Sequence, residues 1–98
     1  MSPDDSVWAI RLERTAEREL NRLYDAARED VIAMLKTLSV DPLLGAPMRR
    51  YKNVRRVYAV SGRFRVIYAL DRRRRMVTVV RIRPRGTAYQ GLRNPRSS

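Results

Sequence analysis

The segment at residues 63–70 reads RFRVIYAL, an apolar run in which arginine occupies the alternate positions 63 and 65. Successive side chains of a β-strand point to opposite faces of its sheet. One face of this strand therefore carries Phe64, Val66, Tyr68 and Leu70, and the other carries Arg63, Arg65, Ile67 and Ala69. Because arginine is costly to bury, such a strand needs a sheet that is covered on one face and open on the other.

Two similar segments flank this strand at hairpin spacing. Residues 54–60 and 76–83 both alternate with the period of a strand, and short polar turns separate them from the central strand. One turn is Ser61-Gly62 and the other is the arginine run at residues 72–75. We expect an antiparallel meander of three strands, in which Pro84 stops the pairing of the last strand because proline has no N–H to donate.

The first half of the chain predicts one strand and two helices. Residues 7–13 alternate like a half-buried strand, and apolar residues then recur at helical spacing. We expect Thr15 to cap a first helix and Asp25 to cap a second, which gives a helical hairpin; one long helix is the alternative. Asp41 precedes a proline and should end the helical region. Residues 42–53 would then form a loop that leads to the meander.

This order of elements predicts an α+β fold, with an N-terminal strand, a helical hairpin and a meander whose one face is covered by the helices. A chain of 98 residues can build one core of two layers, so we expect residues 1–98 to form a single domain. Residues 86–98 read as its basic C-terminal tail. The acidic N-terminus does not resemble a secretory signal, and no segment approaches the roughly 20 apolar residues of a membrane span. We therefore expect a cytoplasmic protein without a membrane partner.

The charge is distributed very unevenly along the chain. The formal net charge is +12, of which residues 1–48 contribute −3 and residues 49–98 contribute +15. A field of this size predicts an anionic partner, with nucleic acid favoured over an acidic protein and over a membrane surface. The arginines at residues 72–75 are interpreted mainly as a solvated hairpin tip.

The chain contains neither cysteine nor histidine. A disulfide framework and a thiolate zinc site are therefore excluded, and so are the commonest metal ligand and the commonest general base near neutral pH. We expect no metal and no cofactor. Any proton transfer must use another residue type.

Arg65 is the most informative residue of the open face. It shares that face with Arg63, and the neighbouring strands can bring Arg56, Arg81 and Arg83 within reach. Like charges opposite each other are unfavourable, so an anion between them is the simplest compensation. Phosphate fits best, because a guanidinium presents paired donors to two of its oxygens.

At these positions the sequence resembles the RelE/ParE toxin superfamily of bacterial type II toxin–antitoxin systems, and RelE more than ParE. The resemblance covers roughly residues 7–90 and is most specific in GRFRVIY at residues 62–68, which fits the pattern G-x-[YF]-R-V-I-Y. The pattern R-x-R-x3-Y follows at residues 83–89. RelE-like members share the predicted fold and cut messenger RNA, usually in the ribosomal A site, whereas ParE-like members inhibit DNA gyrase.

The resemblance also implies roles for individual residues. Arg65 and Arg83 correspond to the arginines that bind the scissile phosphate, and Tyr89 corresponds to the C-terminal tyrosine. Two positions that are lysine in RelE are here Arg56 and Tyr58. The substrate-binding residues that we expect are therefore Arg56, Tyr58, Arg63, Arg85, Arg81 and Lys52.

The general base is left open by the residue types. Arginine does not deprotonate in a protein, so the arginines can bind and stabilise charge only. The candidates are Tyr89, Tyr58, Lys52 or an acid from the helical half, and the cations around a tyrosine would favour its phenolate. We expect Tyr89 to act as the base or to stack on a nucleobase; packing on the sheet edge is an equal alternative.

The resemblance implies three kinds of partner for a toxin of this type. They are messenger RNA, the ribosome and a cognate acidic antitoxin, which would lie across the basic face or against the helical hairpin in a hetero-oligomeric complex. A ParE-like gyrase inhibitor without catalysis and a basic RNA-binding module without toxicity are the alternatives.

Overall fold

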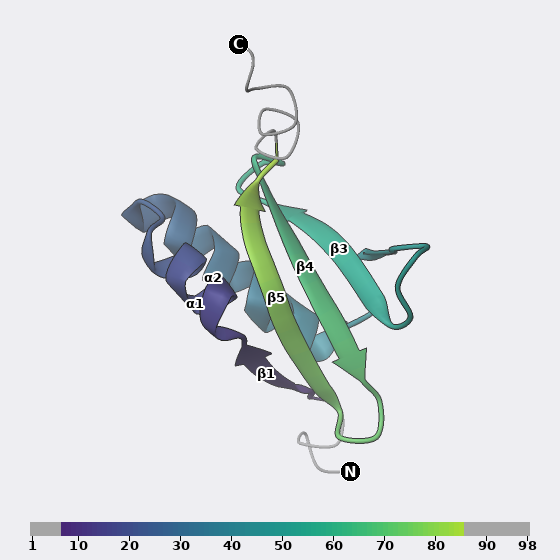
Figure 1. The fold of residues 1–98 in the computed structure, drawn as a ribbon. Coiled ribbons are helices and arrows are strands. Elements are labelled where there is room, and N and C mark those ends of the chain that lie inside the picture. Colours follow the sequence, from purple (N-terminus) through teal and green to yellow (C-terminus); the bar gives the residue numbers. More distant parts are fainter. Residues whose placement is uncertain (1–6, 86–98) are drawn as a thin grey trace.

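The computed structural model describes residues 7–85 of the chain (Figure 1). Within these residues two helices follow a short first strand, and four further strands come after them. The elements are β1 (Ala9–Leu12), α1 (Arg14–Asn21), α2 (Asp25–Val40), β2 (Ala46–Pro47), β3 (Val54–Ala59), β4 (Phe64–Asp71) and β5 (Met76–Pro84).

The strands form one mixed sheet with the order β1-β5-β4-β3-β2. β3, β4 and β5 make the predicted antiparallel meander, and β1 joins its outer edge by pairing in parallel with β5. Both helices lie on the same side of the sheet (Figure 1). The α+β prediction, with helices on one face, is therefore confirmed.

The core lies between the helices and one face of the meander. Val66, Tyr68 and Leu70 of β4 are buried, as their alternation predicts. The rest of the core comes from β3, β5 and the inner sides of both helices, through Ala16, Val31, Leu35, Leu38, Ala59, Val77, Val79 and Ile82. The opposite face of the sheet has no helix over it within residues 7–85, and this is the face that carries Arg65.

The helical hairpin is present, but its caps differ from the prediction. α1 follows Glu13 and α2 follows Tyr24, and neither residue makes a side-chain capping bond. Thr15 and Asp25 instead lie inside the first turns of the helices. α2 ends at Val40, immediately before the Asp41-Pro42 pair that should end it. Neither helix of the described part of the chain is long and apolar enough to cross a membrane.

The prediction that Pro84 stops strand pairing is wrong. β5 continues to Pro84, which lies opposite Phe64, and the Arg85 N–H donates to the Arg63 carbonyl at 2.7 Å. The Ile82 N–H points away from β4 toward α1, and N–H groups two residues apart on a strand point to the same side. The missing N–H of Pro84 thus falls on the outer edge of β5, where no ladder bond is lost.

The predicted loop at residues 42–53 contains the short strand β2, which the sequence did not reveal. The buried Tyr68 hydroxyl anchors this segment, because it donates to the Pro42 carbonyl and accepts from the Gly45 N–H, both at 2.9 Å. A Cβ at position 45 would lie 2.7 Å from that hydroxyl and 2.5 Å from the Arg56 carbonyl. Only glycine fits so close to β3 and β4.

Candidate functional site

The open face of the meander carries two rows of side chains that run across its three strands. In the first row, Tyr58 of β3 lies opposite Arg65 of β4, which lies opposite Arg83 of β5. The next row contains Arg56, Ile67 and Arg81 in the same order of strands. We call these the Arg65 row and the Arg81 row. The register thus brings together five of the residues that the sequence selected.

Arg65 lies at the centre of its row and has an unsatisfied donor. Its Nε is buried and has no hydrogen-bond partner among residues 7–85. A buried donor without an acceptor is costly, and the cost is larger for a charged group. An anion at this position would supply the missing acceptor, as the sequence predicts.

Arg85 adds a further cation beside the Arg65 row. Its guanidinium carbon lies 5.2 Å from the centre of the Tyr58 ring, which is the geometry of a cation–π contact. Arg63 is exposed and lies just before β4, where its carbonyl holds the Arg85 N–H. These two arginines therefore lie at the same end of the meander as the Arg65 row.

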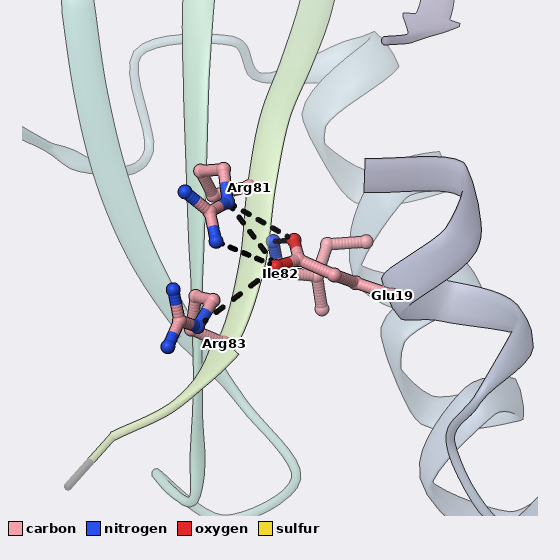
Figure 2. A network of polar contacts seen from close by, with 4 residues as sticks. All are labelled: Glu19, Arg81, Ile82 and Arg83. Atoms are coloured by element: carbon pink, nitrogen blue, oxygen red, sulfur yellow. Dashed lines mark hydrogen bonds and ion pairs between the residues drawn. The ribbon is translucent and has the colours of Figure 1, made fainter. Parts of the chain in front are cut away.

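Glu19 of α1 contacts the arginines that β5 contributes to both rows (Figure 2). Its Oε2 accepts from Arg81, at 2.9 Å from Nη2 and 3.1 Å from Nε, and lies 3.8 Å from Arg83 Nε. Its Oε1 accepts from the Ile82 N–H at 2.7 Å. The Glu19 side chain is 15% exposed, so this ion pair is better shielded from water than an ordinary surface pair. Arg81 is consequently balanced by an acid, and Arg83 partly so.

Sequence reasoning did not single out Glu19, although it included the acids of the helical half as possible bases. A signal was present, because Glu19 lies three residues after Ala16 and four before Leu23 and thus occupies the apolar stripe of α1. An acid on the buried side of a helix normally has a partner. Since its oxygens already accept from Arg81 and from the Ile82 N–H, Glu19 is a poor candidate for the general base.

The remaining predicted residues and acids lie apart from the two rows. Lys52 is exposed in the connection between β2 and β3, and Tyr89 lies outside the described residues. Asp71 lies at the far end of β4 and accepts from the Arg74 N–H at 3.0 Å. Within residues 7–85 no three acidic side chains gather closely enough to hold a metal ion.

One family of known proteins matches the sequence over most of its length. The sequence model described as the ParE toxin of the type II toxin–antitoxin system parDE matches residues 10–89. No curated protein matches the chain.

Solved structures of toxins from both branches of the superfamily are similar to this chain. The RelBE2 toxin–antitoxin complex of Mycobacterium tuberculosis matches with a TM-score of 0.71 and 28% identity, over 81% of this chain and 92% of that chain. The E. coli RelBE complex matches with a TM-score of 0.72 and 18% identity, over 79% and 95%. A chromosomal ParDE system of P. aeruginosa matches with a TM-score of 0.65 and 17% identity, over 81% and 97%. At 17% and 18% identity the last two show a shared fold alone.

Proposed function

We propose, from the premise that this chain belongs to the ParE toxin family of type II toxin–antitoxin systems and to the wider RelE/ParE superfamily, that it is an endoribonuclease. Its substrate would be messenger RNA on the ribosome, in the cytoplasm, and its effect would be to inhibit translation. The preference for RelE-type activity over ParE-type activity rests on the site, since the superfamily contains both kinds of toxin.

The observation that carries this proposal is the unsatisfied hydrogen-bond donor of Arg65. A buried guanidinium Nε that finds no acceptor within the described residues, flanked by Arg83 in register, is a site that a phosphodiester oxygen would complete. Tyr58 lies opposite Arg65 on β3, and Arg85 lies against the Tyr58 ring. These two side chains would contact the sugar or the neighbouring phosphate. A row of this kind offers both charge and paired donors to RNA.

The chemistry would use the 2′-hydroxyl of the RNA itself. That oxygen attacks the adjacent phosphorus, its proton passes to a base, the bond from phosphorus to the 5′-oxygen breaks, and the leaving oxygen takes up a proton. The products are a 2′,3′-cyclic phosphate and a free 5′-hydroxyl. Arg65 and Arg83 would stabilise the charge that develops on phosphorus, and Arg56 and Arg85 would position the strand.

The base is assigned to Tyr89 or to Tyr58. Tyr58 borders Arg65 directly and is 39% exposed, so a substrate could reach it. Separate Tyr58→Phe and Tyr89→Phe variants distinguish the two, because only the loss of the true base lowers the cleavage rate while RNA affinity is kept. If both variants cleave RNA as fast as the wild type, neither tyrosine is the base.

Inhibition of DNA gyrase is the second candidate function. It is favoured by the match to the ParE family model and by the absence of the lysines that RelE has at positions 56 and 58. A gyrase inhibitor would use the same basic face to contact protein or DNA, without cleavage.

In either case we propose an acidic antitoxin as the partner, encoded beside this chain and bound in a hetero-oligomer. RelBE and ParDE structures among the matches are toxin–antitoxin systems. The net charge of +15 on residues 49–98 would attract an acidic segment strongly.

The deciding experiment is brief induction of the chain with and without its neighbouring gene. RNA ends are mapped by primer extension on translated messages, and plasmid supercoiling is followed in the same cells. We expect codon-phased cleavage that disappears in Arg65→Ala and persists in Arg73→Ala, a matched loss of one exposed arginine at the hairpin tip. Loss of supercoiling without new RNA ends would contradict the ribonuclease proposal and support inhibition of gyrase.

A further inference from the structure

Two hollows lie side by side next to the site and share a wall. Met48 and Tyr51, from the connection between β2 and β3, line both of them. The first hollow has a volume of about 320 Å³ and is cationic, with Pro47, Arg49, Arg50 and Arg56 as its other lining residues. The second has a volume of about 300 Å³ and is mostly apolar, with Val54, Ile67, Val80 and Arg81 as its other lining residues. Tyr51 itself is 57% exposed.

The position of Tyr51 is fixed by the backbone around it. The Tyr51 N–H donates to the Met48 carbonyl at 3.0 Å, and the Met48 N–H donates to the Val54 carbonyl at 2.9 Å. The Asn53 carbonyl accepts from the Leu70 N–H at 2.8 Å, which ties the same connection to β4. The backbone that carries the exposed ring is thus part of a structured turn, which lowers the backbone entropy lost when the residue binds a ligand.

Both hollows adjoin the rows of the open face. Ile67 and Arg81 of the apolar hollow, and Arg56 of the cationic hollow, belong to the Arg81 row. That row lies two residues along the strands from Arg65, which is about 7 Å. A strand of RNA whose phosphate is bound at Arg65 would therefore place a neighbouring nucleotide over the hollows.

We propose that the two hollows around Tyr51 bind one unpaired nucleotide of the RNA, next to the nucleotide that is cleaved. Its base stacks on the Tyr51 ring in the apolar hollow, and its phosphate lies among Arg49, Arg50 and Arg56. Each nucleotide of a single strand combines a planar apolar base with an anionic phosphate. The two adjacent hollows offer one apolar and one cationic surface, which match these two groups. This inference rests on the proposed ribonuclease function and adds a subsite to it.

The test measures RNA binding rather than cleavage. A fluorescently labelled single strand with 2′-fluoro groups at every sugar cannot be cleaved, and its affinity is followed by anisotropy at about 0.15 M salt, where unspecific binding is weakened. Abasic residues are introduced at one position at a time. If a base stacks on Tyr51, Tyr51→Ala weakens binding about 5-fold to 100-fold. Tyr51→Phe keeps the ring and retains most of the affinity.

The abasic strands show whether the ring contacts a base. At one position, we expect removal of the base to weaken binding to the wild type about as much as Tyr51→Ala weakens binding of the intact strand. The same abasic strand should bind Tyr51→Ala no more weakly than the intact strand does. The matched control is Leu43→Ala, which removes an apolar side chain that is 49% exposed, before β2 and outside both hollows. This control binds every strand like the wild type.

The outcomes separate the subsite from the function. If Arg65→Ala weakens binding and Tyr51→Ala does not, the subsite is wrong and the ribonuclease proposal stands. If neither variant weakens binding, the subsite falls, and primer extension on translated messages with Arg65→Ala then decides the ribonuclease proposal. If Tyr51→Ala leaves RNA binding unchanged and weakens capture of the cognate antitoxin, the hollows bind a side chain of that protein, and the nucleotide is excluded.

Discussion

Arg65 and Arg81 stand on the same open face, in adjacent rows of the same sheet, and their surroundings differ in one respect. Arg81 is at the edge of the meander, where Glu19 of α1 reaches its guanidinium. Arg65 is on the central strand, and in the part of the chain that the structure describes its buried Nε has no acceptor. The fold thus balances charge where a helix passes beside the sheet and leaves it unbalanced at the centre.

This difference indicates where a ligand belongs. An ion pair that the protein makes with itself must be broken before an outside anion can use the same donors fully, whereas an unsatisfied donor gains a bond at no such cost. The Arg65 row is therefore expected to bind the reacting phosphate. The Arg81 row, which Glu19 holds in place, is expected to support it and to border the neighbouring nucleotide.

The largest expected effect is that of Arg65→Ala on cleavage. Removing a donor that stabilises developing charge lowers rates by about 100-fold to 1,000-fold. Because Arg65 Nε has no partner to lose among residues 7–85, the melting temperature of the variant should equal or exceed that of the wild type. Single-turnover cleavage of messenger RNA on ribosomes and a thermal melt measure the two quantities.

Arg81→Ala supplies the contrast with Arg65→Ala. It should lower cleavage less than 10-fold but reduce the melting temperature, because Glu19 would keep its burial and lose its main cationic partner. If the two variants instead gave equal losses of activity and of stability, the distinction between the central and the edge arginine would be wrong.

The next effect in size is that of Glu19→Gln on stability. The amide can still accept from the Ile82 N–H, but charge-assisted bonds to Arg81 become neutral, at a cost of about 2 kcal/mol in the free energy of unfolding. For a domain of this size that corresponds to a melting temperature lower by roughly 10 °C.

Glu19→Gln should also release Arg81 for RNA. The slope of log affinity against log salt concentration should then become steeper by about one phosphate contact. Glu17→Gln is the matched control, since it removes the same charge from an exposed position of α1. If it changed stability and salt dependence as much as Glu19→Gln, net charge would explain the result and the ion pair would not.

Much of this arrangement could be predicted from the sequence because it depends on local periodicity. The alternation in β4 separates Val66 and Tyr68 from Arg65 without knowledge of any partner strand, and the buried and open faces follow from it. The helical hairpin follows in the same way from an apolar stripe. The cationic Arg65 row needed in addition only the hairpin register, which short turns restrict strongly.

What the sequence could not reveal depends on contacts between distant segments. The pairing of Glu19 with Arg81 joins residues 62 positions apart. The short strand β2 exists because Tyr68 and Gly45 hold the preceding turn against the sheet. The prediction that Pro84 stops strand pairing failed because the side of β5 to which its missing N–H would point is set by the packing of the whole sheet. Local patterns carry no record of such contacts.

A smaller effect is expected for Tyr68→Phe, which acts on the covered face. The variant loses the hydroxyl that bonds Pro42 and Gly45, and we expect the free energy of unfolding to fall by about 1 to 2 kcal/mol at pH 7. RNA affinity should fall only slightly, since the open face keeps its arginines. Chemical denaturation and anisotropy measure the two quantities.

Tyr68 also makes the free energy of unfolding depend on pH. Burial raises the pKa of Tyr68 above the value of about 10 that it has in the unfolded chain. The folded state then holds the phenol proton more tightly than the unfolded state, so the contribution is complete below pH 10 and is lost as the pH rises further. Above about pH 10 the wild type should lose stability more steeply than Tyr68→Phe, and parallel curves would contradict the assignment.

The smallest expected effect is that of Arg73→Ala on RNA binding. Residue 73 is exposed beyond the end of β4, and Asp71, at that end, is six residues along the strand from Arg65, which is about 20 Å. The Debye length at physiological salt is about 8 Å, so a charge at the hairpin tip is largely screened from a phosphate at the Arg65 row. Affinity for the single strand should change less than 2-fold. A loss of 10-fold or more would mean that the RNA runs the whole length of the open face, and the contrast between its centre and its margins would then have to be replaced by one continuous binding surface.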